Sequence, residues 1–456
     1  MTGATLDLAD IQGDILRAYG NRYGRTSYVF IGVGDGDRGR RWLRDRVDRV
    51  TTAVPWHRGR PESTFNVALT SAGLAALGVP EAKIKSFADE FVQGMAARAD
   101  DIGDLDGSAP THWDSGLGTG EAHILVTINA QSSSILEDAL SELRGGLEAA
   151  GRLSLVAEVH AELLRGAREH FGFADGFSQP AIEGVSDEKA PGEGVPLANG
   201  WRALAAGEFI LGYEDEESRA DPKRRLPSAP DDPLGRSGTY MVWRKLYQDV
   251  ALFRRTVREA AHLYPDGDER RLLAKIVGRW PNGAPLVTEP GAEPKGFNPK
   301  ASGANDFRYG DDLEGLRCPL GAHVRRTNPR DALGFEGKLT FRHRLIRRGM
   351  PYGPPLDHRS HQDDGRDRGL VFVCFNASIS RQFESVQTQW LNTGNSFHLG
   401  EDSDFIIGGA RGKMTIQGDP PFFLSALGSF ITTRGGEYLF VPGITALAAI
   451  ADGVAG

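Results

Sequence analysis

The segment EAHILVTINA, residues 121–130, and the segment SILEDALSELRGGLEAA, residues 134–150, decide the fold class. The first is short, rich in β-branched residues and bounded by turn formers, which predicts a strand. The second carries apolar residues at helical spacing, which predicts a helix that packs one face on a sheet. A strand followed by an amphipathic helix is typical of a protein that combines sheet and helix in layers.

The same order of elements occurs in both halves of the chain. In the first half, residues 64–79 pass from a predicted strand into a predicted helix. In the second half, helical patterns follow the strand-like segments TYMVWRK and LVFVCFNAS. We therefore predict two α+β domains whose antiparallel or mixed sheets are covered by helices on one face. The other predicted strands lie at 27–34, 207–213, 239–245 and 370–378.

Size and composition agree with a globular protein of more than one domain. The chain has 456 residues, of which 40% are hydrophobic and 25% charged. Domain sizes of about 100 to 200 residues favour two or more domains for this length. Long loops rich in proline, glycine and charge lie between the predicted elements of the two halves. We place the boundary near residue 200, which gives domains at 1–200 and 201–456.

Charge and hydropathy exclude two classes of partner. The formal net charge is -8, which argues against a general nucleic-acid binder, because such proteins carry a basic face. The opening residues lack a basic region followed by an apolar one. No later run approaches the roughly 18 apolar residues of a spanning helix. We expect a cytoplasmic protein without a membrane partner.

The segment FGFADGFSQP, residues 171–180, places an acid among aromatic rings. Asp175 follows Phe171 and Phe173 and precedes Phe177. One interpretation is a turn, because Asp and Gly favour turns and the rings would simply be core residues. The other is an acid held in an apolar pocket, where desolvation and neighbouring charges adjust it for proton transfer.

A histidine among arginines marks a second candidate site in RCPLGAHVRRTNPRD, residues 317–331. The positive charges beside His323 favour its neutral ring, which is the form that binds metals. Arg326 and Arg330 could hold anionic groups of a ligand by bidentate hydrogen bonds. The alternative is a solvated basic loop with an incidental histidine.

A third segment, RHRLIRRGMPYGPP, residues 342–355, is rich in arginine. Strand-like alternation would direct some of these arginines inward, whereas an ordinary edge strand would direct them to solvent. Combined with Asp175 and His323, an inward arginine makes chemical sense around a haem. The histidine would bind iron, the carboxylate would move a proton, and the arginine would stabilise developing negative charge.

With these motifs in this order, the chain resembles the dye-decolourising (DyP-type) haem peroxidases, in particular the longer bacterial and fungal-like members. The resemblance covers nearly the whole chain and includes LADIQGDILRAYG, LIRRGMPYG, RQFESVQTQW and GGEYLFVPG. It implies two ferredoxin-like α+β modules with antiparallel sheets, of the dimeric α+β barrel type, and one haem b in the C-terminal module. It also implies that Asp175 is the distal acid, His323 the proximal iron ligand and Arg347 the distal arginine.

The resemblance further implies the reaction and several supporting residues. The enzyme would reduce hydrogen peroxide and oxidise dyes, phenolics or similar one-electron donors through an oxidised haem. Glu384 is a candidate acceptor for the second ring nitrogen of His323, since such acceptors orient metal-bound histidines. Tyr352 and Trp390 are candidates for electron transfer at the surface, although buried aromatic residues with one polar partner would show the same pattern.

Three alternatives stay open at this point. The chain could bind or handle haem without appreciable turnover. It could be a monooxygenase whose haem is held by Cys318, although a free cysteine is usually a small buried hydrophobe. The acidic run GYEDEESRAD, residues 212–221, could bind Mn(II) for oxidation, because carboxylate oxygens suit this ion. The oligomeric state is left open.

Overall fold

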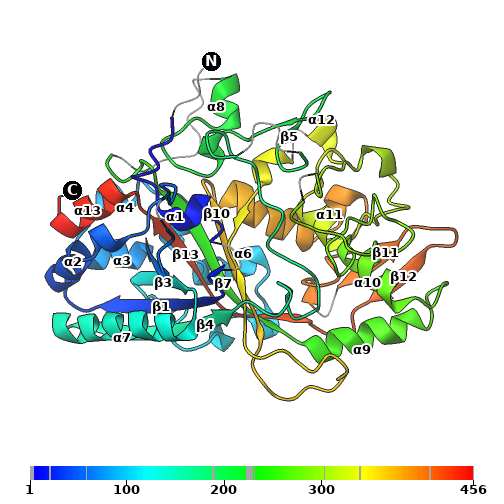
Figure 1. Ribbon diagram of the computed structural model, residues 1–456, viewed down its shortest axis with the longest axis horizontal. Coiled ribbons are helices and arrows are strands. Elements are labelled where there is room, and N and C mark those ends of the chain that lie inside the picture. Colours follow the sequence, from blue (N-terminus) through cyan, green and yellow to red (C-terminus); the bar gives the residue numbers. More distant parts are fainter. Residues whose placement is uncertain are drawn as a thin grey trace.

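The computed structural model describes residues 5–19, 22–57, 59–186, 191–221, 230, 232–301, 303–337, 340–409 and 412–454. Within these residues the main sheet has nine strands, and every strand pair in it is antiparallel. The order is β4-β1-β3-β2-β13-β7-β10-β8, with β9 also paired to β10. Figure 1 shows this sheet running through the molecule, with helices around it.

The first four strands of this order form a ferredoxin-like module. They are connected as βαββαβ, with α2 after β1 and α7 after β3. Ser132 begins α7 by accepting a hydrogen bond from the Ile135 N–H, and Leu136, Leu140, Leu143 and Leu147 form its buried face. The elements are β1 (Arg25–Val33), α2 (Gly36–Arg44), β2 (Ser63–Leu69), β3 (Ile124–Ala130), α7 (Ser133–Ala150) and β4 (Leu153–Glu162).

The remaining strands of the sheet repeat the same order. Counted along the chain, β7, the short pair β8 and β9, β10 and β13 correspond to strands one to four of the first module. Helices follow β7 and β10, and those after β10 are wound as π-helix. The elements are β7 (Thr239–Gln248), α9 (Val250–Ala261), α10 (Glu269–Val277), β8 (Ile346–Arg347), β9 (Met350–Tyr352), β10 (Gly369–Asn376), η9 (Ser380–Glu384), η10 (Val386–Leu391) and β13 (Ile431–Val441).

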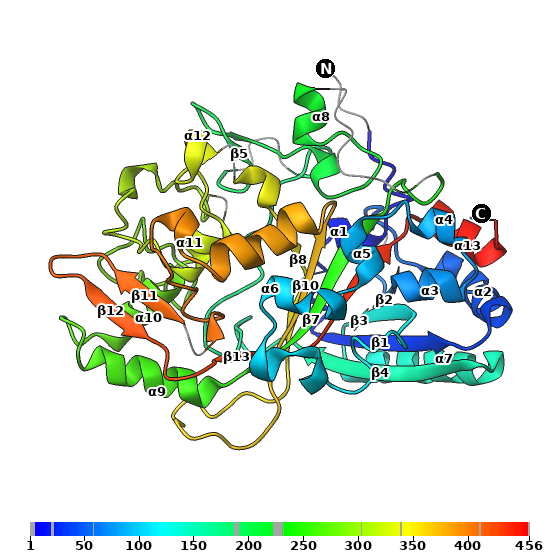
Figure 2. The same ribbon diagram turned by 180° about the vertical axis from the view of Figure 1, so that it is seen from behind.

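Shorter elements connect and cover the two modules. The hairpin β11 (Lys413–Ile416) and β12 (Phe422–Ser425) projects beside α9 and α10, as Figure 2 shows from behind. The small pair β5 (Val195–Pro196) and β6 (Trp201–Arg202) lies in the long connection between the modules. The other α-helices are α1 (Gly13–Leu16), α3 (Ser71–Ala76), α4 (Glu81–Ile84), α5 (Asp89–Gln93), α6 (Ala99–Ile102), α8 (Glu216–Ala220), α11 (His323–Thr327), α12 (Gly334–Gly337) and α13 (Ile444–Asp452).

The two faces of the sheet bury separate cores. Alternate residues such as Phe30, Met241 and Trp243 point into one core that both modules share. Their neighbours, such as Val29 and Val242, face a second core under the helices. At the ends of the sheet, β9 contacts β4, so the sheet curves round in the manner of a barrel. These observations confirm the predicted α+β fold of two ferredoxin-like modules.

The strand predicted at 207–213 is wrong. Residues Ala206–Glu208 form a 3-10 turn, η6, and the apolar residues after it are buried without joining a sheet. Gly207 allows this path, because a Cβ there would lie 2.2 Å from the carbonyl oxygen of Tyr213. The apolar run fills the core at a tight turn. The domain boundary near residue 200 stays a prediction. In the described part of the chain, no helix has the length and apolar character needed to cross a membrane.

Candidate active site

A large cavity lies on the helix-covered face of the C-terminal module. Its volume is about 1140 Å³, somewhat above the range of about 300–1000 Å³ typical of small-molecule pockets. Side chains of β7, β10 and β13 form part of its wall, and α11, η9 and η10 contribute others. The loop at 169–180, which follows β4, supplies a further side. Residues of both modules therefore enclose the cavity.

His323 begins α11 and lines this cavity. Its Nδ1 lies 3.1 Å from Oδ2 of Asp404, a carboxylate that is fully buried. The other oxygen, Oδ1, accepts hydrogen bonds from the N–H groups of Ile406 and Ile407. With Nδ1 engaged by a carboxylate, Nε2 is the ring nitrogen left to bind a metal.

Asp404 is held in its ionised form despite its burial. Burial acts to raise the pKa of this carboxyl. Three neighbours outweigh the effect of burial: His323 through its charge and hydrogen bond, Arg326 through its charge, and Ile407 through its backbone N–H. The pKa of Asp404 therefore lies below its ordinary value. A carboxylate that accepts from Nδ1 fixes the ring and makes Nε2 a stronger donor to a metal.

Asp175 and Arg347 face the same cavity. Nη1 of Arg347 lies 3.3 Å from Oδ1 of Asp175, and Nη2 donates to the carbonyl oxygen of Ser178 at 3.1 Å. The backbone N–H of Arg347 donates to the side chain of Gln179. The acid and the arginine predicted from separate motifs are thus in direct contact. Both side chains are 41% exposed, so the acid is open to the cavity and is not sealed by aromatic rings.

The three phenylalanines around Asp175 all line the cavity. The ring of Phe171 packs on Phe253 with centroids 4.3 Å apart, and Phe177 lies under the guanidinium of Arg279 at 5.1 Å. Phe173 is buried in the core below the loop. The rings therefore serve as core residues and as cavity wall at once, which combines the two interpretations of this motif.

Four arginines give one part of the wall a positive charge. Arg279, Arg330, Arg344 and Arg347 all line the cavity. Burial, and behind it the repulsion between neighbouring guanidinium groups, lowers the pKa of Arg279, Arg330 and Arg344 to about 10. A ligand with carboxylates would relieve this repulsion. A haem, which carries propionate groups, fits a cavity with this wall and one available imidazole.

Two predicted supporting residues have other roles. Arg326 is fully buried and donates to the carbonyl oxygens of Trp390, Thr393 and Asp402, so it ties α11 to the chain around η10 and does not line the cavity. Glu384 pairs with Arg98 at 2.6 Å and accepts from the Tyr438 hydroxyl. The partner of His323 is Asp404, and the prediction of Glu384 for this position is wrong.

Tyr352 and Trp390 are both buried, each with 5% of its surface exposed. The Tyr352 hydroxyl donates to Asp367 at 3.1 Å, and Nζ of Lys245 lies 4.8 Å from the ring centroid. The Trp390 ring packs against His343, with centroids 5.0 Å apart. Surface positions were expected for these rings, so that part of the prediction is wrong.

Cys318 does not lie where it could hold an iron. The thiol is fully buried, and burial raises its pKa to about 11. The thiol is therefore neutral, whereas the thiolate is the form that binds metals. The residue also lies outside the cavity wall. The geometry favours His323 over Cys318.

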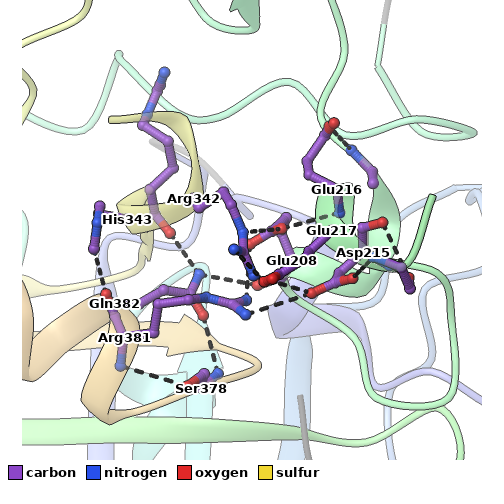
Figure 3. Close-up of polar contacts among 12 residues, drawn as sticks. Glu208, Asp215, Glu216, Glu217, Arg342, His343, Ser378, Arg381 and Gln382 are labelled. Carbon is purple, nitrogen blue, oxygen red and sulfur yellow. Dashed lines mark hydrogen bonds and ion pairs between the residues drawn. The ribbon is translucent and has the colours of Figure 1, made fainter. Parts of the chain in front are cut away.

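The acidic run at 212–221 is engaged with arginines, as Figure 3 shows. Asp215 contacts Arg342 and Arg381, Glu216 pairs with Arg202 at 2.7 Å, and Glu217 pairs with Arg342. Across the residues that the structure places, no cluster of three or more His, Cys, Asp or Glu side chains is arranged to hold a metal ion.

The same network holds the segment that carries the cavity arginines. The side chain of Gln382 donates to the carbonyl oxygens of Glu208 and Arg344 at 2.9 and 2.8 Å. Arg381 pairs with Glu208 at 2.9 Å. The residues before Arg347 are therefore anchored to η9 and to the turn at Glu208.

We expect the protein to be more stable at pH 5 than at pH 8, partly because of Glu208. Burial raises the pKa of this carboxyl from 4.5 to about 7, against the opposing charge of Arg381. The folded state binds this proton more tightly, so the stabilisation is complete below the unfolded pKa and is lost as the pH rises through about 7. Thermal unfolding midpoints measured across this range should fall with pH, and Glu208→Gln should reduce the slope.

Glu148→Gln is the control, because Glu148 is exposed on α7. Some slope should persist in Glu208→Gln, since burial also raises the pKa of Asp14 and Glu437 to about 7. An unchanged slope in Glu208→Gln would contradict the assignment.

A haem peroxidase needs an imidazole to bind iron, an acid to move protons and an arginine to stabilise charge. This cavity, which fits a haem, is lined by all three groups. Comparison with known proteins agrees. The model of the DyP dimeric alpha+beta barrel domain matches residues 10–161, and that of the Dyp-type peroxidase C-terminal domain matches residues 274–405. The chain belongs to the family of dye-decolourising peroxidases.

Individual relatives match over almost their whole length. The multifunctional dye peroxidase DyP2 of Amycolatopsis sp. is 32% identical over 96% of this chain and 95% of its own. The dye-decolorizing peroxidase msp1 of Mycetinis scorodonius is 28% identical over 98% of this chain and 88% of its own. A solved dye-decolorizing peroxidase in complex with 2,6-dimethoxyphenol is 27% identical, with a TM-score of 0.82 and coverage of 98% of this chain and 100% of its own.

Sequence reasoning missed Asp404, Arg279 and a second cavity acid, Glu169. Asp404 stands directly before the apolar residues Phe405 and Ile406, and an acid beside such a run is a signal that could have been used. Arg279 stands next to Trp280 in no motif. Glu169 lies two residues before the segment 171–180 that contains Asp175.

Proposed function

We propose that His323 binds the iron of a haem b in this cavity, and that Asp175 and Arg347 act together on hydrogen peroxide. The protein is a haem-dependent peroxidase by its family, and peroxide and organic reductants such as phenols are its substrate classes. The observation that carries the residue assignment is that a histidine backed by a buried carboxylate and a contacting Asp–Arg pair line one cavity.

A bound haem would supply the redox-active iron, and the chain would supply the proton chemistry. Asp175 would take a proton from one oxygen of hydrogen peroxide and return it to the other, which leaves as water. Arg347 would stabilise the negative charge that develops as the oxygen–oxygen bond breaks. Arg330, with Arg279 and Arg344, would hold the haem propionates, since a buried arginine wall favours carboxylates.

Electrons from bulky donors would have to cross the protein. Tyr352 and Trp390 remain candidates, as buried relays instead of surface sites. The Tyr352 hydroxyl has a proton acceptor in Asp367, and oxidation of a phenol requires such an acceptor at neutral pH. Phenolic donors are supported by the relative solved with 2,6-dimethoxyphenol. Oxidation of Mn(II) gains no support from residues 212–221, because three of their five carboxylates, those of Asp215, Glu216 and Glu217, are paired with arginines.

Absorption spectroscopy of the purified, haem-loaded protein tests this proposal. We expect a Soret band that changes on addition of hydrogen peroxide and recovers when 2,6-dimethoxyphenol is added, with multiple turnovers of the donor. The pyridine haemochrome spectrum identifies the haem as haem b. Stable haem binding without turnover would support a haem-handling protein instead. The oligomeric state stays open, and the cytoplasmic location stays a prediction.

A further inference from the structure

A second carboxylate lines the cavity on the same loop as Asp175. Glu169 lies six residues earlier and belongs to none of the motifs that point to the reaction. Its Oε2 accepts from the N–H of Phe171 at 2.8 Å and from Nε2 of Gln248 at 2.9 Å. Its Oε1 accepts from the N–H of Phe173 at 2.9 Å. One carboxylate therefore accepts three hydrogen bonds, two of them from the loop backbone.

These bonds close the loop on itself just before Asp175. The backbone of Glu169 also donates to the carbonyl oxygen of Phe173, and Gly172 donates to that of Glu169, each at 3.0 Å. Beyond this closed turn, Ala174 donates to the carbonyl oxygen of Pro281 and Asp175 to that of Ala167. Asp175 is thus held directly after a turn that the hydrogen bonds of the Glu169 carboxylate stabilise.

We propose that Glu169 is a positioning residue of the peroxidase reaction, whose carboxylate fixes the loop so that Asp175 meets Arg347 at the cavity. This inference rests on the function proposed above. Glutamine cannot replace the carboxylate fully, because its amide nitrogen would meet a backbone N–H as a second donor. The loss of one bond would loosen the turn beside Asp175.

The charges around Glu169 agree with a location close to the reacting groups. Enclosure by the protein raises the pKa of Glu169, and the negative charge of Asp175 raises it further, against the three hydrogen bonds that it accepts. The next residue, His170, has a pKa that burial lowers, and Arg168 donates to the carbonyl oxygen of Gly172 in the same turn. Strand β7 contributes the neutral amide of Gln248.

The test uses cyanide binding to the ferric, haem-loaded protein together with the peroxide reaction. Hydrogen cyanide must give up its proton to bind iron, so its association rate reports the positioned acid without turnover. We expect Glu169→Gln to slow both cyanide association and the peroxide-dependent Soret change by about 10- to 100-fold, as expected for a small displacement of a catalytic group. The KM for the phenolic donor should stay unchanged.

Glu437→Gln is the matched control. Glu437 is also a buried carboxyl that accepts from a backbone N–H, that of Gly118, and its pKa is also raised, but it does not line the cavity. Glu437→Gln should leave both rates at the wild-type value. Rates for Glu169→Gln within twofold of wild type, or an equal loss in Glu437→Gln, would overturn the proposal.

Glu169→Asp covers the case in which Glu169→Gln does not fold. It keeps the carboxylate but shortens the side chain by one methylene, so it cannot reach all three donors at once. Glu169→Asp should also slow both rates, and wild-type rates in this variant would overturn the proposal.

Cyanide association also separates the proposed peroxidase function from the positioning role of Glu169. Wild-type protein that binds cyanide but does not react with peroxide would refute the proposed function. The cyanide rates of wild type and Glu169→Gln would still test the role of Glu169.

Discussion

His323→Ala is expected to abolish tight haem binding while the fold survives. The proposed bond from Nε2 to iron would be lost, and no other residue of the cavity wall with described placement is a histidine or a cysteine. The side chain is 29% exposed and makes one polar contact through its ring, to Asp404, so the effect on packing should be small. Haem titration followed at the Soret band, with thermal unfolding of the same samples, measures both outcomes.

His358→Ala is the control for His323→Ala, because His358 has a 79% exposed side chain in a surface loop. The variant should bind haem like the wild type. In His323→Ala, the buried carboxylate of Asp404 loses its partner. The double variant His323→Ala with Asp404→Asn also removes that unpaired charge, so it should unfold at a higher temperature than His323→Ala alone. Full haem retention with an unchanged ferric spectrum in His323→Ala would refute the assignment of the ligand.

Arg347→Leu is expected to slow the peroxide reaction more than Asp175→Asn does. Asp175→Asn should cost about 10²- to 10⁴-fold, the range typical of general acid–base catalysis. Arg347→Leu removes a preorganised donor worth about 3 kcal/mol, or about 10²-fold in rate. The substitution takes away the side chain that contacts Asp175, so part of the contribution of Asp175 is lost as well. It also removes the hydrogen bond from Nη2 to Ser178, which anchors the loop after Asp175. Stopped-flow mixing with hydrogen peroxide, followed at the Soret band with haem bound, ranks the two variants.

Asp357→Asn and Arg359→Leu are suitable controls, because both residues are exposed on the loop between β9 and β10. They should react at the wild-type rate. If Asp175→Asn and Arg347→Leu also do so, neither residue acts on the peroxide, and the proposed site is wrong.

The fold was predictable from sequence where the spacing of apolar residues and the length of a segment both indicated the same element, either a strand or a helix. The strand expected at 121–130 and the helix at 134–150 are β3 and α7, since alternation or helical spacing is set by which face is buried. The apolar run at 207–213 failed because burial alone does not distinguish a strand from a turn packed in the core. Its glycines, and not its apolar residues, determine the path of the backbone there.

For the site, sequence motifs identified residues that contact each other in the cavity. They did not identify the residues that hold these side chains in place. Asp175 and Arg347 come from distant segments and meet as expected. Arg326 and Arg330 are four positions apart, yet only Arg330 lines the cavity, since α11 ends at Thr327 and the chain turns at Arg330 with φ of 55°. Asp404 reaches His323 from 81 residues away, and neither spacing nor composition encodes such a tertiary contact.

The position of β13 has a consequence for how the protein is made. This strand comes after every other strand along the described chain, yet it lies between β2 and β7 in the middle of the sheet. A ribosome therefore releases β7 and β10 well before the strand that completes their sheet exists. The second module has to wait for residues 431–441, so its cavity can be assembled only late in synthesis or after it, whereas β1 to β4 are complete much earlier.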